Sequence, residues 1–219
     1  LLILVSLICI LLFKMNGAQY MRGVKNSART MVDAAPALLL AVPMVQVFVN
    51  SGSADPTLAG ALPNMPMVLA ESAAALAGQA WPNVSPWIGG LGAFIAGSNT
   101  VSNMMFSYFQ FQTAQHIGLN IDQSAVVVAL QAIGGAAGNM ICVHNVVAAG
   151  AVVGLMNREG EVIRKTLVPF VFYCLQGGFI GQALITGNPL WWGLAVAWFV
   201  VFFALLYTRK SGNPEAVAK

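Results

Sequence analysis

Long apolar stretches separated by short polar segments run through the whole chain. Residues 1–13 are fewer than the roughly 20 apolar residues that a helix needs to cross a bilayer, and they predict a truncated span. Basic residues among apolar ones indicate a cytoplasmic loop or surface helix at 14–33, and an apolar span follows at 34–49. Residues 166–207 predict two further spans joined by an uncharged turn. The pattern therefore predicts an all-α, polytopic transmembrane helical bundle.

Two apolar segments in the middle of the chain are interrupted. Segment 86–117 has an apolar arm, a small polar centre and an aromatic arm, which predicts a re-entrant hairpin. Two ordinary spans are the alternative, because they also give an even number of membrane crossings. Segment 123–155 is long for one span and has glycines near its centre, which predicts a discontinuous helix. The sequence leaves open whether 57–85 crosses the bilayer, because its apolar run is short. The helix-breaking glycines of segment 123–155 are Gly134, Gly135 and Gly138.

Composition places this pattern in a lipid environment. Of 219 residues, 58% are hydrophobic and only 8% are charged, whereas a soluble domain carries about 25% charged residues. The mean hydropathy is +0.76. The basic residues form short clusters between apolar segments, so the net charge of +3 indicates orientation in a membrane and not a nucleic-acid partner. We expect one membrane domain over 1–219, the C-terminal part of a larger protein.

The cysteines give little support for metal or enzyme chemistry. Cys9, Cys142 and Cys174 lie far apart inside apolar segments, which predicts neither a disulfide framework nor a zinc site. We expect no metal and no cofactor. An intramembrane enzyme that uses Cys142 and His144 is disfavoured, because residues two apart on a helix point to different faces.

The first polar interruption, 97–103, puts hydroxyl and amide groups where an apolar arm ends and a helix begins. Such a position offers unpaired N–H groups, the positive end of a helix dipole and hydroxyl donors, which together can hold a carboxylate. Capping of the helix by the same residue types is the structural alternative, and the two roles are compatible. The candidate substrate-binding residues here are Ser98, Asn99, Thr100, Ser102 and Asn103.

The second interruption, 134–145, combines glycines that let the backbone open with polar side chains just after them. Exposed carbonyl groups there can coordinate a cation, and Asn139 and Asn145 can bond a substrate hydroxyl or carboxylate. Histidine is the residue type whose charge changes near neutral pH, which makes His144 the candidate for proton coupling. A hydrogen-bonded packing histidine is the alternative.

Three features between Asn64 and Ile180 carry a family resemblance. They are the Gly-Ser-Asn-Thr-x-Ser-Asn stretch at 97–103, the arm 106–115 with its glutamines, and the Gly-Gly-x-x-Gly motif at 134–138. Together they resemble the L-lactate permease family of bacterial carriers. The resemblance implies uptake of lactate or glycolate, generally with protons, inverted repeats and paired re-entrant hairpins.

The resemblance also implies roles for particular residues. In related anion carriers, Ser-Asn-Thr motifs at hairpin tips contact the substrate carboxylate and coupling ions, which points to Ser98, Asn99 and Thr100. Two positions depart from the pattern of the better-known lactate permeases, which often have an acidic residue at the position of Asn99 and lysine at that of Asn139. Both are neutral asparagines in this chain, which preserves the charge balance and changes the site's chemistry.

These observations predict a secondary active transporter, and no enzyme, in the bacterial inner membrane. The expected substrate is lactate or a related small 2-hydroxy monocarboxylate, and the expected coupling ion is H⁺. A sodium-coupled carrier of another organic carboxylate is the alternative. A structural or channel subunit is a third possibility, but a purely structural one would not need two buried polar interruptions. We expect the two interruptions to face each other near the membrane midplane. The expected partners are the organic anion, membrane lipid and a second copy of the chain.

Overall fold

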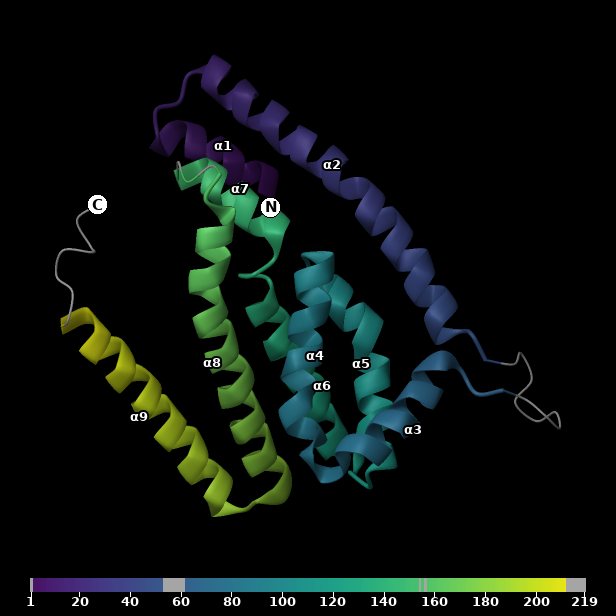
Figure 1. Cartoon of the computed structure of the whole chain (residues 1–219). Coiled ribbons are helices and arrows are strands. Elements are labelled where there is room, and N and C mark those ends of the chain that lie inside the picture. Colours follow the sequence, from purple (N-terminus) through teal and green to yellow (C-terminus); the bar gives the residue numbers. More distant parts are fainter. Residues whose placement is uncertain (1, 53–61, 154, 156, 212–219) are drawn as a thin grey trace. The chain divides into compact units, whose positions relative to one another are not determined.

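The structure, a computed structural model, describes residues 2–52, 62–153, 155 and 157–211 (Figure 1). All regular elements of these residues are helices, which confirms the predicted all-α class. The chain divides into two compact units, Leu1–Met44 and Val45–Lys219. The elements are α1 (Leu2–Leu12), α2 (Gly17–Val49), α3 (Met65–Ala77), η1 (Gly78–Ala80), α4 (Trp81–Ala96), α5 (Asn99–His116), α6 (Ile121–Gly138), α7 (Val143–Val153), α8 (Glu159–Thr186) and α9 (Pro189–Ser211).

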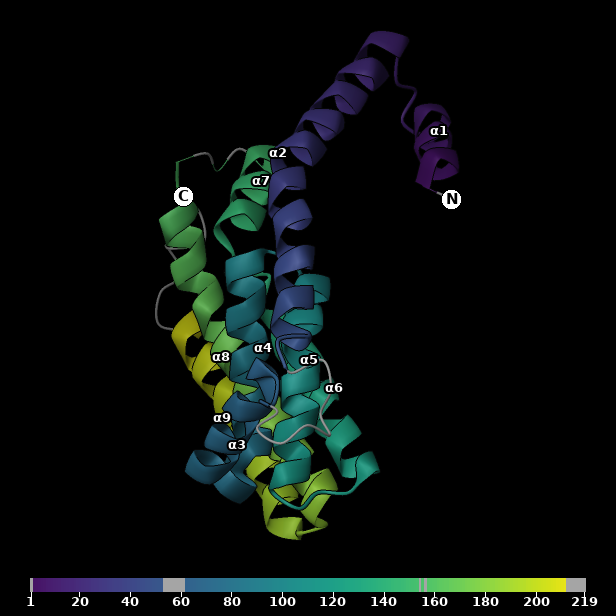
Figure 2. The same cartoon turned by 90° about the vertical axis from the view of Figure 1, so that its right-hand side faces the viewer.

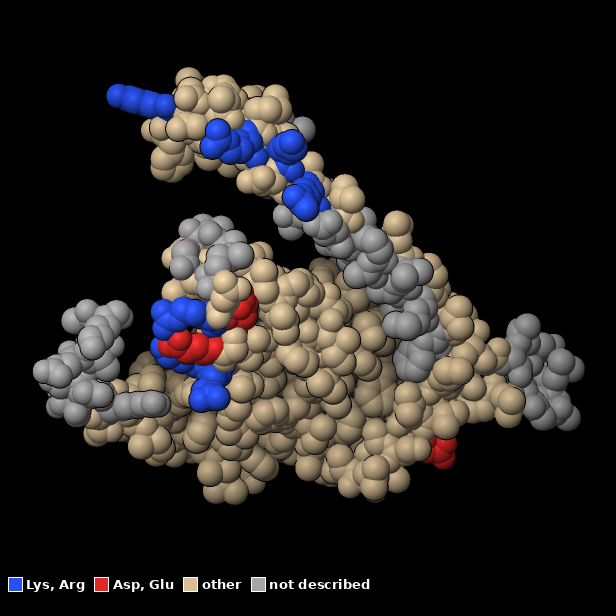
Figure 3. Space-filling model, turned by 45° about the horizontal axis from the view of Figure 1, so that its top comes forward, with Lys and Arg blue, Asp and Glu red and all other residues tan. Residues whose placement is uncertain are grey.

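The first unit contains α1 and most of α2. The hydroxyl groups of Ser6 and Tyr20 hydrogen-bond at 3.1 Å and link the two helices. Because α2 is continuous for 33 residues, the loop alternative for 14–33 is wrong from Gly17 onward, and this segment forms one helix with 34–49. Basic side chains are exposed along this unit (Figure 3). They are Lys14, Arg22, Lys25 and Arg29.

Three helices of the described residues are long and apolar enough to cross a membrane: α6, α8 and α9. The predicted spans in 166–207 correspond to α8 and α9, but α8 begins earlier, at Glu159. Acidic groups in a first helical turn interact favourably with the helix dipole. Glu161 also pairs with Arg158 at 2.6 Å and with Lys165 at 2.8 Å, in a cluster of mixed charge on the second unit (Figure 3). These pairs are exposed, so solvent screens their charges and they add little to stability.

Segment 57–85 is only partly described. Residues 57–61 lie outside the described residues, and the rest forms α3, η1 and the start of α4. Asn64 caps α3, since its Oδ1 accepts from the backbone N–H of Met67 at 3.0 Å. At 13 residues, or about 20 Å, α3 is shorter than the hydrocarbon core of a bilayer.

Helices α4 and α5 form an antiparallel helical hairpin whose turn is Gly97-Ser98. The hairpin begins at Trp81, five residues before the predicted 86. Helix α4 ends because Gly97 adopts a left-handed conformation with φ of 66°, which glycine reaches without steric cost. Ser98 then caps α5, and its Oγ accepts from the N–H of Val101 at 3.4 Å.

Helices α4 and α6 run parallel and touch backbone to backbone (Figures 1 and 2). A Cβ atom added at Gly134 would lie 1.8 Å from the carbonyl oxygen of Pro86. One turn further along both helices, a Cβ at Gly138 would lie 2.2 Å from the carbonyl oxygen of Gly90. Small residues at such positions let helices approach closely, as in membrane helix pairs generally.

The glycines of α6 therefore have a different role from the predicted one. Gly134 and Gly135 lie inside α6 and do not break it, and Gly138 is its last residue. Residues 139–142 form a turn, and α7 begins at Val143. Glycine weakens an isolated helix, but it also permits close contact with a neighbouring backbone. Here the contact with α4 stabilises α6, which remains helical through Gly134 and Gly135.

A ladder of buried hydrogen bonds joins α4, α5 and α6. The indole N–H of Trp81 donates to Oε1 of Gln110 at 2.8 Å, and Nε2 of Gln110 donates to Oε1 of Gln131 at 2.9 Å. Nε2 of Gln131 donates to Oγ of Ser102 at 3.0 Å, and this hydroxyl donates to the carbonyl oxygen of Gly89 at 2.8 Å. Trp81, at the start of this ladder, is buried, with 4% of its surface exposed.

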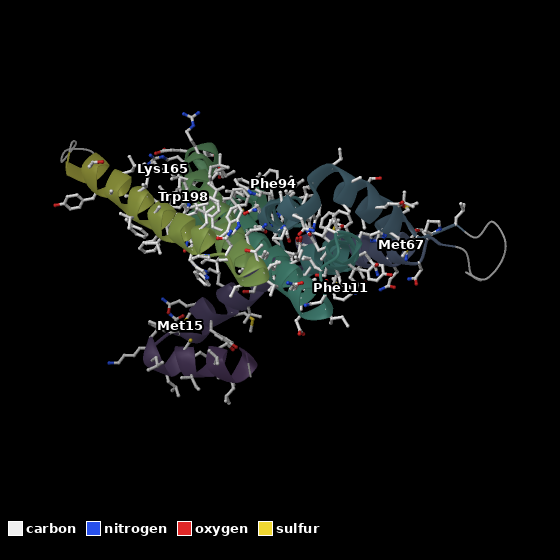
Figure 4. The ribbon with its side chains drawn as sticks, turned by 90° about the horizontal axis from the view of Figure 1, so that it is seen from below. Met15, Met67, Phe94, Phe111, Lys165 and Trp198 are labelled. Carbon is white, nitrogen blue, oxygen red and sulfur yellow. The ribbon has the colours of Figure 1, made fainter. Side chains whose placement is uncertain are left out.

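Helix α8 runs antiparallel to α4 and covers one side of the α4–α6 pair. Cys174 Sγ donates to the carbonyl oxygen of Pro86 at 3.7 Å, and Nε2 of Gln182 donates to that of Gln79 at 2.8 Å. Helix α9 packs on α8 through aromatic side chains, and Trp198 lies between the two (Figure 4).

We predict that Gly134→Ala destabilises the protein, because the added methyl group collides with the backbone of α4. Overpacking of this kind costs about 1–3 kcal/mol. The melting temperature of the purified full-length protein should fall. Gly193→Ala in α9 is the matched control, since nothing lies within 4 Å of its Cβ position. Equal melting temperatures for the two variants would contradict the packing argument.

Candidate functional site

The two polar interruptions meet in the structure, where the end of α6 lies beside the α4–α5 turn. Asn145 joins them, because its Nδ2 donates to the carbonyl oxygen of Gly97 at 3.1 Å and to that of Asn139 at 3.3 Å. One side chain from α7 thus fastens the hairpin turn to the end of α6. Since its donor group is used in these two bonds, Asn145 positions the site and is a weaker candidate for direct substrate contact.

The N-terminus of α5 is the part of the site suited to an anion. The first N–H groups of a helix have no partner within it, and here they include those of Asn99 and Thr100. The side chain of Thr100 is exposed and that of Ser98 is partly exposed. Helix N-termini bind carboxylates and phosphates through such N–H groups and the positive end of the dipole.

Asn99 lies tightly against α6. Its Oδ1 is 2.1 Å from the position that a Cβ at Gly135 would take, so only glycine at 135 leaves room for this amide. The glycine pattern indicated a helix break at Gly135 and gave no sign of its contact with Asn99. The available signal was a glycine inside a helix, next to Gly134, which contacts the backbone of α4.

Three amide oxygens near the site are buried without a hydrogen-bond partner: Oδ1 of Asn99, Asn103 and Asn139. A buried acceptor without a donor costs about 1–3 kcal/mol. Native structures contain few such atoms, and each calls for an explanation. A ligand or water with a donor group would satisfy them.

Ser102 is placed differently from the other candidates. It is fully buried between α4, α5 and α6, where its hydroxyl donates to Gly89 and accepts from Gln131. Its contacts therefore belong to the buried ladder, one turn below the tip of the hairpin.

His144 covers the hairpin turn. Its side chain is exposed, and its Nε2 lies 1.6 Å from the position of a Cβ at Gly97, so the ring occupies the space that glycine leaves. Its Nδ1 is 3.2 Å from Sγ of Cys142. The expectation that these two side chains point apart was wrong, because Cys142 precedes the first residue of α7, Val143.

Residues 1–186 match the L-lactate permease family. The chain belongs to the L-lactate permease family. This confirms the resemblance carried by the motifs at 97–103 and 134–138.

Several relatives in this permease family are similar to the chain. A putative L-lactate permease of Haemophilus influenzae is 33% identical over 171 residues, which are 78% of this chain and 30% of that protein. An L-lactate permease of Escherichia coli K12 is 37% identical over 101 residues, which are 46% of this chain and 18% of that protein. The glycolate permease GlcA of the same organism is 35% identical over 103 residues, 47% of this chain and 18% of that protein. No solved structure matches the chain.

Membership of a permease family, together with the apolar helices, indicates an integral membrane protein. The chain spans less than a third of the length of these relatives. The contact between Cys142 and His144 lies at the start of α7, where the His144 ring covers Gly97.

We predict that Gly135→Ala lowers uptake of the transported anion without removing any polar group. The added methyl group would displace the Asn99 amide by about 1 Å, and misplacement of that size costs up to about 100-fold in enzyme sites. Uptake by cells expressing the full-length protein, corrected for the amount in the membrane, measures the effect. Gly160→Ala is the control, because its Cβ position is open. Normal uptake by Gly135→Ala would show that the position of Asn99 is unimportant.

Proposed function

We propose that this chain is the substrate-binding part of a secondary active transporter for lactate or a related small 2-hydroxy monocarboxylate. The observation that supports it best is the N-terminus of α5, which lies against the end of α6 with buried amide oxygens beside it. The printed names of the relatives, L-lactate permease and glycolate permease, favour the same class of substrate. We place the transporter in a bacterial inner membrane, which it crosses several times.

In this proposal the carboxylate lies against the first turn of α5. The N–H groups of Asn99 and Thr100 donate to it, with the hydroxyl groups of Ser98 and Thr100 as further donors. Neither 97–103 nor 134–145 contains Lys or Arg, so the helix terminus supplies the positive potential. A site without a fixed full charge releases its anion more readily after transport.

We further propose that the α4–α5 hairpin is re-entrant and that α6 and α7 form one discontinuous helix, with the site near the midplane. Neither α4 nor α5 is among the described helices that are long and apolar enough to cross a membrane, which favours the re-entrant alternative. Buried hydrogen bonds and glycine contacts join α4, α5 and α6, so these helices would move together during transport.

The proposed coupling ion is H⁺, with His144 as the group that carries it. Its ring lies on the hairpin turn, where a change of charge would act on the segment that holds the substrate. The alternative is Na⁺, and the proposal includes no cofactor. Membrane lipid and a second copy of the chain are the proposed partners.

Uptake of labelled L-lactate by cells that express the full-length protein tests this function. Sodium and a protonophore are varied independently. We expect saturable uptake that the protonophore abolishes and that is indifferent to sodium. Uptake that follows sodium and resists the protonophore would make Na⁺ the coupling ion in place of H⁺. Absence of uptake despite verified expression would overturn the assignment of lactate as the substrate.

We predict that Asn99→Ala abolishes most of this uptake, because the variant loses the amide that lies between the anion site and α6. Loss by a factor of about 10 or more is expected for a group that positions substrate. Asn188→Ala, in the exposed turn before α9, is the control. Intact uptake by Asn99→Ala at normal membrane abundance would count against the site.

A further inference from the structure

Two side-chain donors near the hairpin tip are already bonded within the protein. Asn145 Nδ2 donates to the carbonyl oxygens of Gly97 and Asn139, and the Ser102 hydroxyl donates to that of Gly89. The buried acceptors, by contrast, have no partner: Oδ1 of Asn99, Asn103 and Asn139. At this site the buried side-chain atoms that lack a partner are therefore all acceptors.

The three oxygens belong to one neighbourhood. Asn99 and Asn103 are four residues apart in α5 and so lie on the same face of that helix. The Asn99 oxygen contacts α6 at Gly135, and Asn139 follows Gly135 by four residues. All three amides thus lie beside the first two turns of α5, next to the proposed position of the carboxylate.

Acceptors select a ligand that carries a donor. A carboxylate and a keto group accept hydrogen bonds only, whereas the hydroxyl group of a 2-hydroxy acid donates one from the carbon next to the carboxylate. We propose that the amide oxygens of Asn99, Asn103 and Asn139 recognise the 2-hydroxyl group and exclude 2-oxo and unsubstituted monocarboxylates. This inference rests on the proposed function and adds to it the residues that determine specificity.

The expected preference for 2-hydroxy acids follows from the free-energy cost of leaving the buried amide oxygens without a donor. A site built to bond a hydroxyl rejects an analogue that lacks it, because the buried polar groups of the site are then left unpaired. One neutral hydrogen bond corresponds to about tenfold in affinity. L-lactate should therefore bind at least about tenfold more tightly than propionate or pyruvate, which have nearly the same size.

The test measures dissociation constants of L-lactate, pyruvate and propionate for the purified full-length protein by titration calorimetry in sodium-free buffer. Asn103→Leu and Asn139→Leu remove one acceptor each while keeping the number of side-chain heavy atoms and their branching, and they leave the start of α5 intact. We expect the affinities for lactate and propionate to converge in both variants. Asn103→Ser, which keeps an acceptor oxygen, should restore part of the preference.

Asn83→Leu is the matched control. Its Oδ1 is also buried without a partner, but it lies against Gly178 of α8, far along α4 from the hairpin turn. The lactate preference should be unchanged in this variant. Loss of preference in Asn83→Leu as well would show a general effect of losing a buried amide and overturn the assignment.

Two further outcomes separate the inference from the function on which it rests. Lactate and propionate binding equally well to the unaltered protein, or a preference that appears only after sodium is added, would overturn the inference alone. In the second case a sodium ion, and not the hydroxyl group, satisfies the oxygens. Absence of binding by all three acids would overturn the proposed function and the inference together.

Discussion

The close contact between the backbones of α4 and α6 is the constraint on which the rest of the second unit depends. Apolar side chains gain little free energy by moving from lipid into a helix–helix interface, so membrane helices associate through van der Waals contact and hydrogen bonds. Gly90, Gly134 and Gly138 remove the side chains that would keep the two helices apart. The approach brings the hairpin turn to the end of α6.

The buried ladder then fixes the third helix against this pair. Gln110 and Gln131 are fully buried, and each amide both donates and accepts within the ladder. Removal of one member would leave its neighbours unpaired at a cost of about 1–3 kcal/mol each, which makes the arrangement specific. The ladder holds α5 antiparallel to α6, which places the N-terminus of α5 beside the end of α6.

The sequence predicted the helical class and the polar turn between two helical arms, because apolar length and capping residues are local signals. Ser98 is an example, since a serine between an apolar arm and a helix is a cap in almost any context. The sequence could not predict which distant residue each side chain contacts. Gly134 was interpreted as a helix break, because the Pro86 backbone that contacts it is distant in sequence.

The ladder from Trp81 to Gly89 also has a direction. It starts at an indole that can only donate and ends at a carbonyl that can only accept, so every amide between them has one allowed orientation. The positive ends of these amide dipoles all point along the ladder toward Ser102, near the start of α5. The scaffold that holds the helices together is therefore also an electrostatic element, a row of aligned dipoles that adds positive potential to the end of the hairpin where an anion would bind.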